Sequence, residues 1–235
     1  MADDAPLHGD LAVRVRVDPA ALEWQASPSG GVARKRFHRV GPAEAGQVTS
    51  LVRYGPGSRF PTHPHPDGEE ILVLEGVFSD HRGDWPAGSW LASPEGFEHA
   101  PASAPGCLLF VKLRQYPGAR PRRAFVAEPD ARWPARPDGV RRLALLDDPA
   151  FPERIYLEAW DAGRCAALAD PGGLELFVVE GAVRVDGERL PRHGWLRLPA
   201  GDRGVVLAAD EASRLWCKRG GVAQLASAGL PVRPS

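Results

Sequence analysis

Apolar and polar residues alternate along this chain in short runs that turn-forming residues separate. The segment 11–17, LAVRVRV, alternates apolar and basic side chains with a period of two, which is typical of a strand with one solvated face. Comparable runs predict further strands at 47–54, 70–74, 107–114, 155–160, 175–179 and 215–218. The pattern favours an all-β fold made of short strands.

Composition strengthens this interpretation. The 26 glycines and 24 prolines make up about 21% of the 235 residues, against a usual share of about 12%. Both residue types interrupt helices, so few ordinary helices are expected. Cys107, Cys165 and Cys217 form no CxxC pair, which excludes a disulfide framework or a thiolate zinc site and favours core thiols.

The balance of charge narrows the classes of partner. A formal net charge of −1 gives no basic surplus that would attract nucleic acid or an anionic membrane. No apolar run approaches the roughly 18 residues of a membrane span, and the first ten residues, MADDAPLHGD, do not resemble a signal peptide. We expect a cytoplasmic protein that binds neither nucleic acid nor membrane.

The chain contains an internal repeat. A shift of 105 residues aligns 66–96 with 171–201 without a gap, and eleven of the 31 positions are identical, where composition alone predicts about two. Many of the shared residues form turns, among them Gly76 and Gly181. The two halves are therefore expected to be copies of one β module, connected through the segment 116–139, which is rich in proline, arginine and alanine.

Three histidines and a glutamate in the first copy are candidate metal ligands. His63 and His65 are two residues apart, so on a strand both imidazoles face the same side. Glu69 follows a turn-forming Pro-Asp-Gly, and His99 follows the turn Pro-Glu-Gly, which would bring a partner strand alongside. Three imidazoles and a carboxylate suit a borderline divalent cation, but the histidine pair alone is equally consistent with surface histidines.

The spacing around these residues carries a family resemblance. The strings G-x5-H-x-H-x3-E-x6-G, from Gly57, and G-x5-P-x-G-x2-H, from Gly88, resemble the two motifs of the cupin superfamily. That resemblance implies jelly-roll (double-stranded β-helix) barrels and one divalent metal ion bound by four residues of the first barrel. The implied ligands are His63, His65, Glu69 and His99.

Residues 53–115 resemble more closely the cupin domain of ChrR-type anti-sigma regulators, through GEEILVLEGVFSD, PAGSWL, HAP and GCLLFVKLRQ. The resemblance implies a metal-binding ChrR-like cupin over 1–120 and a second cupin over 121–235. ChrR-type regulators also contain an N-terminal zinc module that binds the sigma factor. No such His and Cys pattern precedes residue 53, so sigma-factor binding is not expected here.

The second copy departs from the motif at every ligand position. The 105-residue shift aligns His63, His65, Glu69 and His99 with Leu168, Asp170, Leu174 and Gly204. We therefore expect a degenerate second barrel that binds no metal.

Other residues, outside the motif, are expected either in the core or on solvated strand faces. Trp90 and Trp195 occupy equivalent positions and are expected in the core. We expect Glu175, Glu180 and Lys112 on solvated strand faces.

Two main functions remain open, and the metal distinguishes them. Four protein ligands complete the shell of Zn²⁺, whereas Fe²⁺, Mn²⁺ or Ni²⁺ would retain open positions. The first function is a small-molecule metalloenzyme, a dioxygenase of the cupin type. The alternative is a non-catalytic zinc cupin in stress signalling that binds an effector or a protein partner. A metal-stabilised scaffold and a homodimer also stay open, and the sequence identifies no separate catalytic base.

Overall fold

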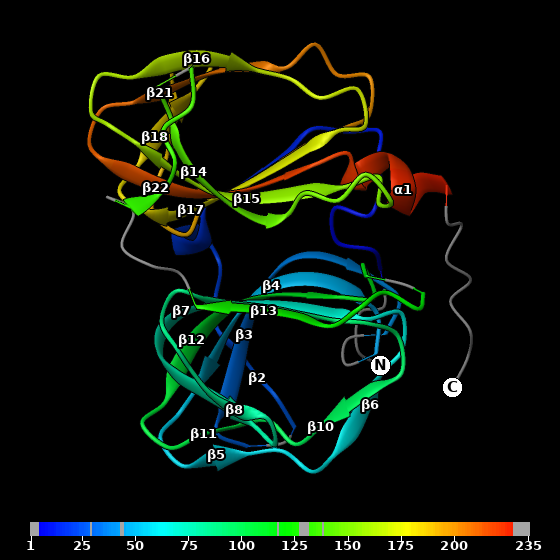
Figure 1. Ribbon diagram of the computed structural model, residues 1–235. Coiled ribbons are helices and arrows are strands. Elements are labelled where there is room, and N and C mark those ends of the chain that lie inside the picture. The colour runs from blue at the N-terminus through cyan, green and yellow to red at the C-terminus, as the bar shows by residue number, and fades with distance from the viewer. Residues whose placement is uncertain are drawn as a thin grey trace. The chain divides into compact units, whose positions relative to one another are not determined.

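The computed structural model describes residues 5–28, 30–42, 45–116, 118–126, 132–137 and 139–227. They form two compact units (Figure 1). The described part of the first unit comprises 5–9 and 22–126, and that of the second comprises 10–21 and 132–227. The architecture is all-β, as expected, and the described residues contain one α-helix, which is too short to cross a membrane.

The first unit is a jelly roll whose strands pair antiparallel. Its main sheet has the order β13-β9-β7-β12-β4-β3-β2, with β5, β8 and β11 attached beside it, while β6 and β10 pair separately. The bounds are β2 (Gln25–Ala26), β3 (Val32–Val40), β4 (Gln47–Tyr54), β5 (Ser58–Arg59), β6 (His63–His65), β7 (Glu69–Asp80), β8 (Gly83–Pro86), β9 (Ser89–Ser93), β10 (Phe97–His99), β11 (Ala102–Ser103), β12 (Cys107–Leu113) and β13 (Arg123–Val126).

The second unit contains a six-stranded sheet, β1-β20-β17-β22-β15-β14, and a four-stranded sheet, β16-β21-β18-β19. The bounds are β1 (Val15–Val17), a 3-10 turn (Pro19–Ala21), β14 (Arg141–Leu146), β15 (Arg154–Trp160), β16 (Cys165–Leu168), β17 (Leu174–Glu180), β18 (Val183–Val185), β19 (Glu188–Leu190), β20 (Trp195–Leu198), β21 (Val205–Ala209), β22 (Ser213–Arg219) and α1 (Gly221–Ser227).

Strand pairing reproduces the sequence repeat in three dimensions. Ile71 of β7 pairs with Leu91 of β9, and 105 residues later Leu176 of β17 pairs with Leu196 of β20. The repeated glycine at position 76 and at 181 has a φ of 72° in both copies, and an added Cβ at Gly76 would lie 2.0 Å from a backbone oxygen. Because only glycine adopts this conformation without strain, both copies retain it.

Two strands belong to a different unit from the residues that surround them in the sequence. β1 pairs with β20 in the second unit, and β13 pairs with β9 in the first. A domain boundary after residue 120 would assign β1 to the first domain and β13 to the second. The predicted strand at 11–17 is also shorter than expected, because only its last three residues pair.

The repeated tryptophans are core residues, as expected, but the acidic and basic residues beside them are not solvated. Trp90 donates a hydrogen bond to Glu70, and Trp195 donates one to Glu175, each over 3.1 Å. Glu175 and Lys112 are each 1% exposed, and Lys112 donates to Thr49 Oγ1 over 2.9 Å. The expectation of solvated faces for Glu175 and Lys112 was therefore wrong, because strand alternation alone does not reveal a sheet that is covered on both faces.

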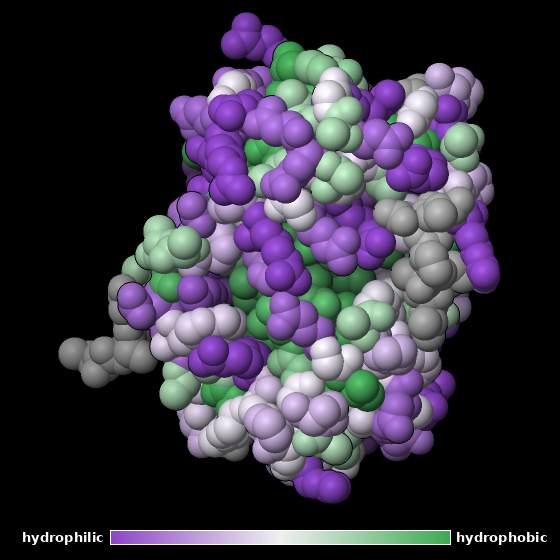
Figure 2. Space-filling view, turned by 90° about the vertical axis from the view of Figure 1, so that its left-hand side faces the viewer, coloured by the Kyte–Doolittle hydropathy of each residue, from purple (hydrophilic) through white to green (hydrophobic). Residues whose placement is uncertain are grey.

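The visible surface is mainly hydrophilic. In Figure 2, hydrophobic side chains show in patches among the hydrophilic ones. Among the described residues, the large hydrophobic side chains that are strongly exposed are Val13 and Val206.

Candidate metal centre

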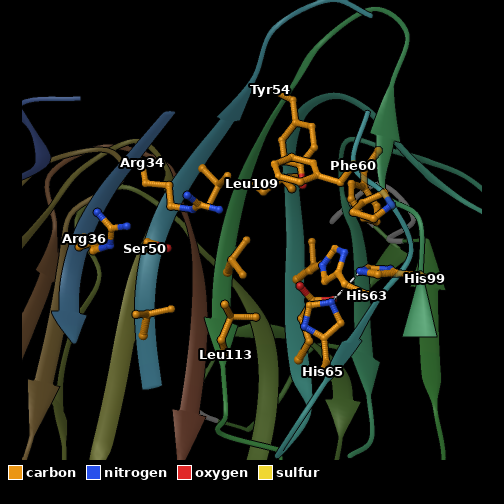
Figure 3. A pocket seen from close by; sticks show the side chains of 17 residues that line it. Arg34, Arg36, Ser50, Tyr54, Phe60, His63, His65, His99, Leu109 and Leu113 are labelled. Carbon is orange, nitrogen blue, oxygen red and sulfur yellow. Dashed lines mark hydrogen bonds and ion pairs between the residues drawn. The ribbon is translucent and has the colours of Figure 1, made fainter. Parts of the chain in front are cut away.

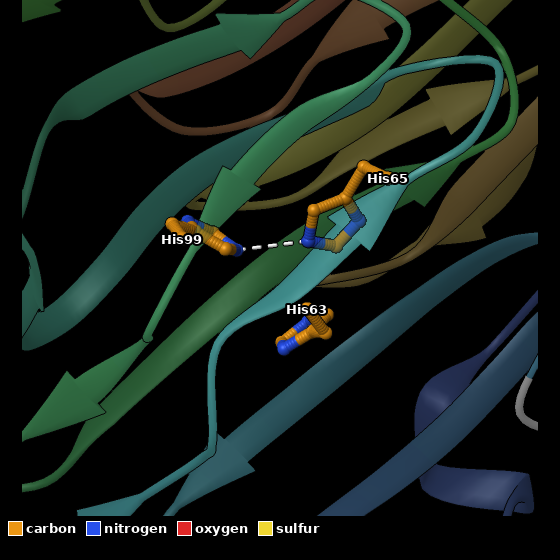
Figure 4. A group of neighbouring side chains, drawn as sticks. All are labelled: His63, His65 and His99. Carbon is orange, nitrogen blue, oxygen red and sulfur yellow. Dashed lines mark hydrogen bonds between the residues drawn. The ribbon is translucent and has the colours of Figure 1, made fainter.

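Strands β6 and β10 bring the three predicted histidines onto one face. They pair antiparallel, with His99 opposite His63 and Phe97 opposite His65. Because His63 and His65 are two residues apart on β6, their side chains point to the same side, and His99 joins them from the neighbouring strand. Figure 4 shows the three imidazoles directed toward one another.

The distances within this group are those of a compact ligand cluster. One ring nitrogen from each histidine lies within 4.8 Å of the other two. The closest pair is His65 Nε2 and His99 Nε2, which are 2.8 Å apart, and both residues are buried. Within the described part of the chain, this is the one group of three or more metal-ligand residues with such spacing.

Glu69 lies beside the cluster at the beginning of β7. Asp67 and Gly68 both have positive φ, and this turn reverses the chain after His65. Glu69 Oε2 is 3.4 Å from His99 Nε2 and 3.6 Å from His65 Nε2, and the residue is 7% exposed. The carboxylate is thus within reach of an ion held by the imidazoles, and its role as a fourth ligand stays a prediction.

The protonation of the cluster suits a metal. Burial, together with the neighbouring His99 and His63, lowers the pKa of His65 to about 3, so this imidazole is neutral at physiological pH. Burial raises the pKa of Glu69, because its charged form is desolvated, and the histidines oppose this shift. Neutral imidazole and a carboxylate that prefers a nearby positive charge form a donor set that fits a borderline divalent cation.

Asp80, at the end of β7, lies next to the Nδ1 edge of the His99 ring. Its Oδ2 atom lies 3.8 Å from His99 Nδ1, on the opposite side of the ring from the cluster. The carboxylate accepts hydrogen bonds from Arg82 N (2.8 Å), Trp85 Nε1 (3.2 Å) and Arg122 Nη2 (3.0 Å). Burial would raise its pKa, but hydrogen bonding with His99, Arg82 and Trp85 and the charge of Arg122 hold the pKa at about 2, so Asp80 is ionised. A carboxylate behind a ligating imidazole orients the ring.

Sequence reasoning missed Asp80 and Arg122. Nothing in the local sequence distinguishes Asp80 from other hairpin-loop acids, and Arg122 lies in the segment interpreted only as a connection.

The cluster forms part of the wall of a pocket inside the first barrel (Figure 3). Its empty volume is about 620 Å³, a figure that includes the open solvent at its mouth. Most of the lining is apolar, with Phe60 and Phe78 near the histidines. Arg34 and Arg36, which sequence reasoning also missed, line it from β3.

The second barrel differs at each equivalent position. Leu168 and Leu174 are buried in its apolar core, and Gly204 replaces the third imidazole. Asp170 is 7% exposed and accepts a hydrogen bond from Arg154 Nη2 over 2.9 Å, so its carboxylate is part of a local structural pair.

Comparison with known proteins agrees with this architecture. The family model of the ChrR cupin-like domain matches residues 12–117. Over these residues the chain is similar to that family, to which the sequence motifs also pointed. The comparison with curated proteins found no match to the chain.

Solved structures resemble this chain over most of its length. A provisionally assigned dioxygenase from Nostoc punctiforme has a TM-score of 0.68 at 14% identity, over 90% of this chain and 84% of that one. Salicylate 1,2-dioxygenase from Pseudoaminobacter salicylatoxidans has a TM-score of 0.64 at 16% identity, over 92% and 83%. The nickel complex of the pirin YhhW from Escherichia coli has a TM-score of 0.62 at 17% identity, over 88% and 98%. Identities this low show a shared fold alone.

Proposed function

We propose that the first barrel binds one divalent metal ion through His63, His65, His99 and Glu69 and catalyses the dioxygenation of a small organic molecule. The observation that carries this proposal is the convergence of three imidazole nitrogens on the wall of a largely apolar pocket.

The residues of the pocket have separable roles in such a reaction. A bound ion with open coordination positions would supply Lewis acidity and oxygen activation. The three histidines and Glu69 would hold it, and Asp80 would keep the His99 ring in its ligating orientation. Phe60, Phe78 and the aliphatic wall would exclude bulk water from the reacting molecule.

Two structural neighbours support this choice of chemistry. Salicylate 1,2-dioxygenase is described as forming adducts with gentisate, and the pirin YhhW is described with nickel(II). Both observations concern those proteins, and they favour a transition metal and an oxygenase reaction for this chain.

Elemental analysis followed by oxygen-uptake measurements tests the proposal. We expect about one iron, manganese or nickel ion per chain in protein purified without added metal, and oxygen consumption with a β-diketone or a phenolic ketone. His63→Ala should abolish both, whereas His81→Ala, outside the cluster, should retain both. Stoichiometric metal in His63→Ala would contradict the ligand assignment.

A regulatory zinc cupin is the second candidate, and the match to the ChrR cupin-like domain favours it. In that case the pocket would take an effector and no reaction would follow. Stoichiometric zinc, with no oxygen uptake even after exchange for Fe²⁺, would favour this alternative over the enzyme.

A further inference from the structure

We propose that Tyr54 is a specificity-determining residue of the pocket, and that its hydroxyl donates a hydrogen bond to an acceptor oxygen of an aromatic substrate whose other end faces the histidines. The inference rests on the proposed function, because it concerns the far end of the molecule that the metal would hold. It adds a substrate class that the metal site alone does not define, namely aromatic compounds with an acceptor oxygen opposite their metal-directed groups.

Strand β4 directs the Tyr54 side chain into the pocket. Every second residue of this strand lines the pocket, namely Val48, Ser50, Val52 and Tyr54, as strand alternation requires. Tyr54 stands at the end of this row and is partly exposed. Figure 3 shows its ring extending from β4 toward Phe60. The phenol is therefore part of the pocket wall.

Two phenylalanines lie between Tyr54 and the histidines. The Tyr54 ring centroid is 5.5 Å from that of Phe60 and 6.2 Å from that of Phe78. Phe60 in turn lies 6.2 Å from the His63 ring, and Phe78 lies 6.0 Å from the His99 ring. All five rings line the same pocket. A molecule that reaches from the histidines to Tyr54 would contact both phenylalanines, and an aromatic body suits them because ring pairs attract at centroid separations of about 4.5–7 Å.

The Tyr54 hydroxyl is available as a donor. It hydrogen-bonds to no other residue in the described part of the chain. Burial, together with the nearby Glu69, raises the pKa of Tyr54 far above its usual value, so the phenol keeps its proton. Because a partly buried hydroxyl without an acceptor is unfavourable, a bound molecule that supplies an acceptor gains affinity there.

Strand register identifies the equivalent of Tyr54 in the second barrel. Val73 and Val178 occupy the same position of the repeat, and their partners across the sheet are Leu109 and Leu215. On the next strand of the first barrel, Leu109 pairs with Val52.

In the second barrel the corresponding partner of Leu215 is Glu158. Two residues further along each strand, Tyr54 therefore corresponds to Trp160. Trp160 lies in the apolar core, and its Nε1 donates a hydrogen bond to Glu158 Oε2 over 2.9 Å. The aromatic donor of the second barrel thus has its acceptor inside the fold. Val52 offers no such acceptor in the first barrel, and we assign that part to the substrate.

Isothermal titration calorimetry on the metal-loaded protein tests this assignment with two probes. 3,4-Dihydroxyacetophenone and 4-isopropylcatechol have the same two chelating hydroxyl groups and nearly the same shape, but only the first has a carbonyl oxygen at its other end. We expect Tyr54→Phe to weaken 3,4-dihydroxyacetophenone about three- to tenfold, because the hydrogen bond is lost, and to leave 4-isopropylcatechol and the metal content unchanged.

A matched control removes the same group elsewhere. Tyr156→Phe deletes a phenol hydroxyl from the second barrel and should leave both affinities unchanged. A general disturbance of the first barrel by Tyr54→Phe would weaken both probes alike, so the ratio of the two affinities isolates the hydrogen bond. Equal losses for the two probes, or no binding of either to metal-loaded protein, would overturn the assignment of Tyr54.

Acetophenone, which has the carbonyl oxygen but no chelating groups, separates this inference from the proposed function. Binding of acetophenone that Tyr54→Phe weakens, in protein that acquires no metal, would refute the metal site and retain the role of Tyr54. Metal binding and oxygen uptake with an unchanged ratio of the two catechol affinities in Tyr54→Phe would retain the proposed function and refute the role of Tyr54.

Discussion

The two barrels share a scaffold but differ in what fills them. The first has a pocket lined by histidines, a glutamate and two arginines. At the positions of His63 and Glu69 the second has Leu168 and Leu174, which belong to a continuous apolar core. The pairing of β7 with β9 recurs between β17 and β20, and the glycine turn at 76 recurs at 181. The residues that shape this part of the barrel have therefore been kept while those that give it chemistry have changed.

Energetics explain why the degenerate copy persists. Fully burying a leucine side chain stabilises a fold by about 1.5–3 kcal/mol, whereas a desolvated carboxylate or imidazole destabilises it unless an ion or a partner compensates. Replacing ligands by leucine therefore gives an apolar core whose stability does not depend on a bound metal ion. We expect the second barrel to be the more stable unit in metal-free protein.

The largest contrast should come from removing a ligand. We expect His99→Ala to weaken the metal affinity by a factor of several hundred or more. A four-ligand site binds its ion with about 10–16 kcal/mol, so removing one ligand should cost about 3–4 kcal/mol of binding free energy. Equilibrium dialysis followed by elemental analysis measures this, with His81→Ala as the matched control. Unchanged metal affinity in His99→Ala would place the ion elsewhere.

Removing apolar volume from the second barrel should affect stability and not metal. Leu174 is fully buried at the position equivalent to Glu69, so Leu174→Ala should lower the free energy of unfolding by about 2–5 kcal/mol. Urea denaturation measures the loss, and Val206→Ala, at a residue that is 49% exposed, should cost far less. A drop in metal content of Leu174→Ala would contradict an empty second barrel.

Substituting either of the two equivalent tryptophans, Trp90 or Trp195, should lower the free energy of unfolding by a similar amount. Trp90→Phe and Trp195→Phe each remove one hydrogen bond to a buried glutamate, which should cost about 1.5–3 kcal/mol in either barrel. Denaturation of both variants tests whether the scaffold is energetically equivalent in the two copies. Costs that differ by more than about 1 kcal/mol would show that the copies have diverged beyond the ligand positions.

Asp80 has no counterpart in the second barrel, where the 105-residue shift places the buried apolar Val185. We expect Asp80→Asn to weaken metal binding about ten- to a hundredfold, because the His99 ring loses its orienting carboxylate. Competition with a metal chelator measures the change. Asp84→Asn, on the same hairpin, should have a much smaller effect, and equal effects would assign Asp80 a merely structural role.

The smallest effect concerns pH and is confined to the first barrel. Because burial raises the pKa of Glu69, folded metal-free protein holds this proton more tightly than unfolded chain does. Its contribution to stability is therefore present at low pH and is lost as pH rises from the ordinary glutamate value of about 4.3 through the raised pKa. Thermal melts of wild type and Glu69→Gln should diverge over this range, and parallel curves would contradict the shift.

Much of the fold could be predicted from the sequence. The turn residues and the strand period predicted the all-β class and the repeat, and β4 has the predicted bounds. The jelly-roll class followed from the resemblance to the cupin motifs. The proximity of His63, His65 and His99 followed from the H-x-H spacing and from a turn that pairs β10 with β6. These features depend on local geometry, which the sequence encodes directly.

Features that depend on contacts between distant strands could not be predicted. Arg34 and Arg36 lie on β3, a strand that the sequence did not predict, and they line the pocket next to β4. Burial of Lys112 and Glu175 likewise depends on what covers their sheet, which residue type and alternation do not reveal. Asp80 acquires its role solely because β7 continues past the point where β17 ends.

The placement of β1 and β13 affects the order in which the protein can be completed during synthesis. The first barrel lacks its edge strand until Val126 has left the ribosome. The second barrel needs β1, which is synthesised before most of the first barrel. A gene cut between the two halves would therefore produce two fragments, each missing a strand that only the other encodes. Recovering folded protein should require producing both fragments in the same cell.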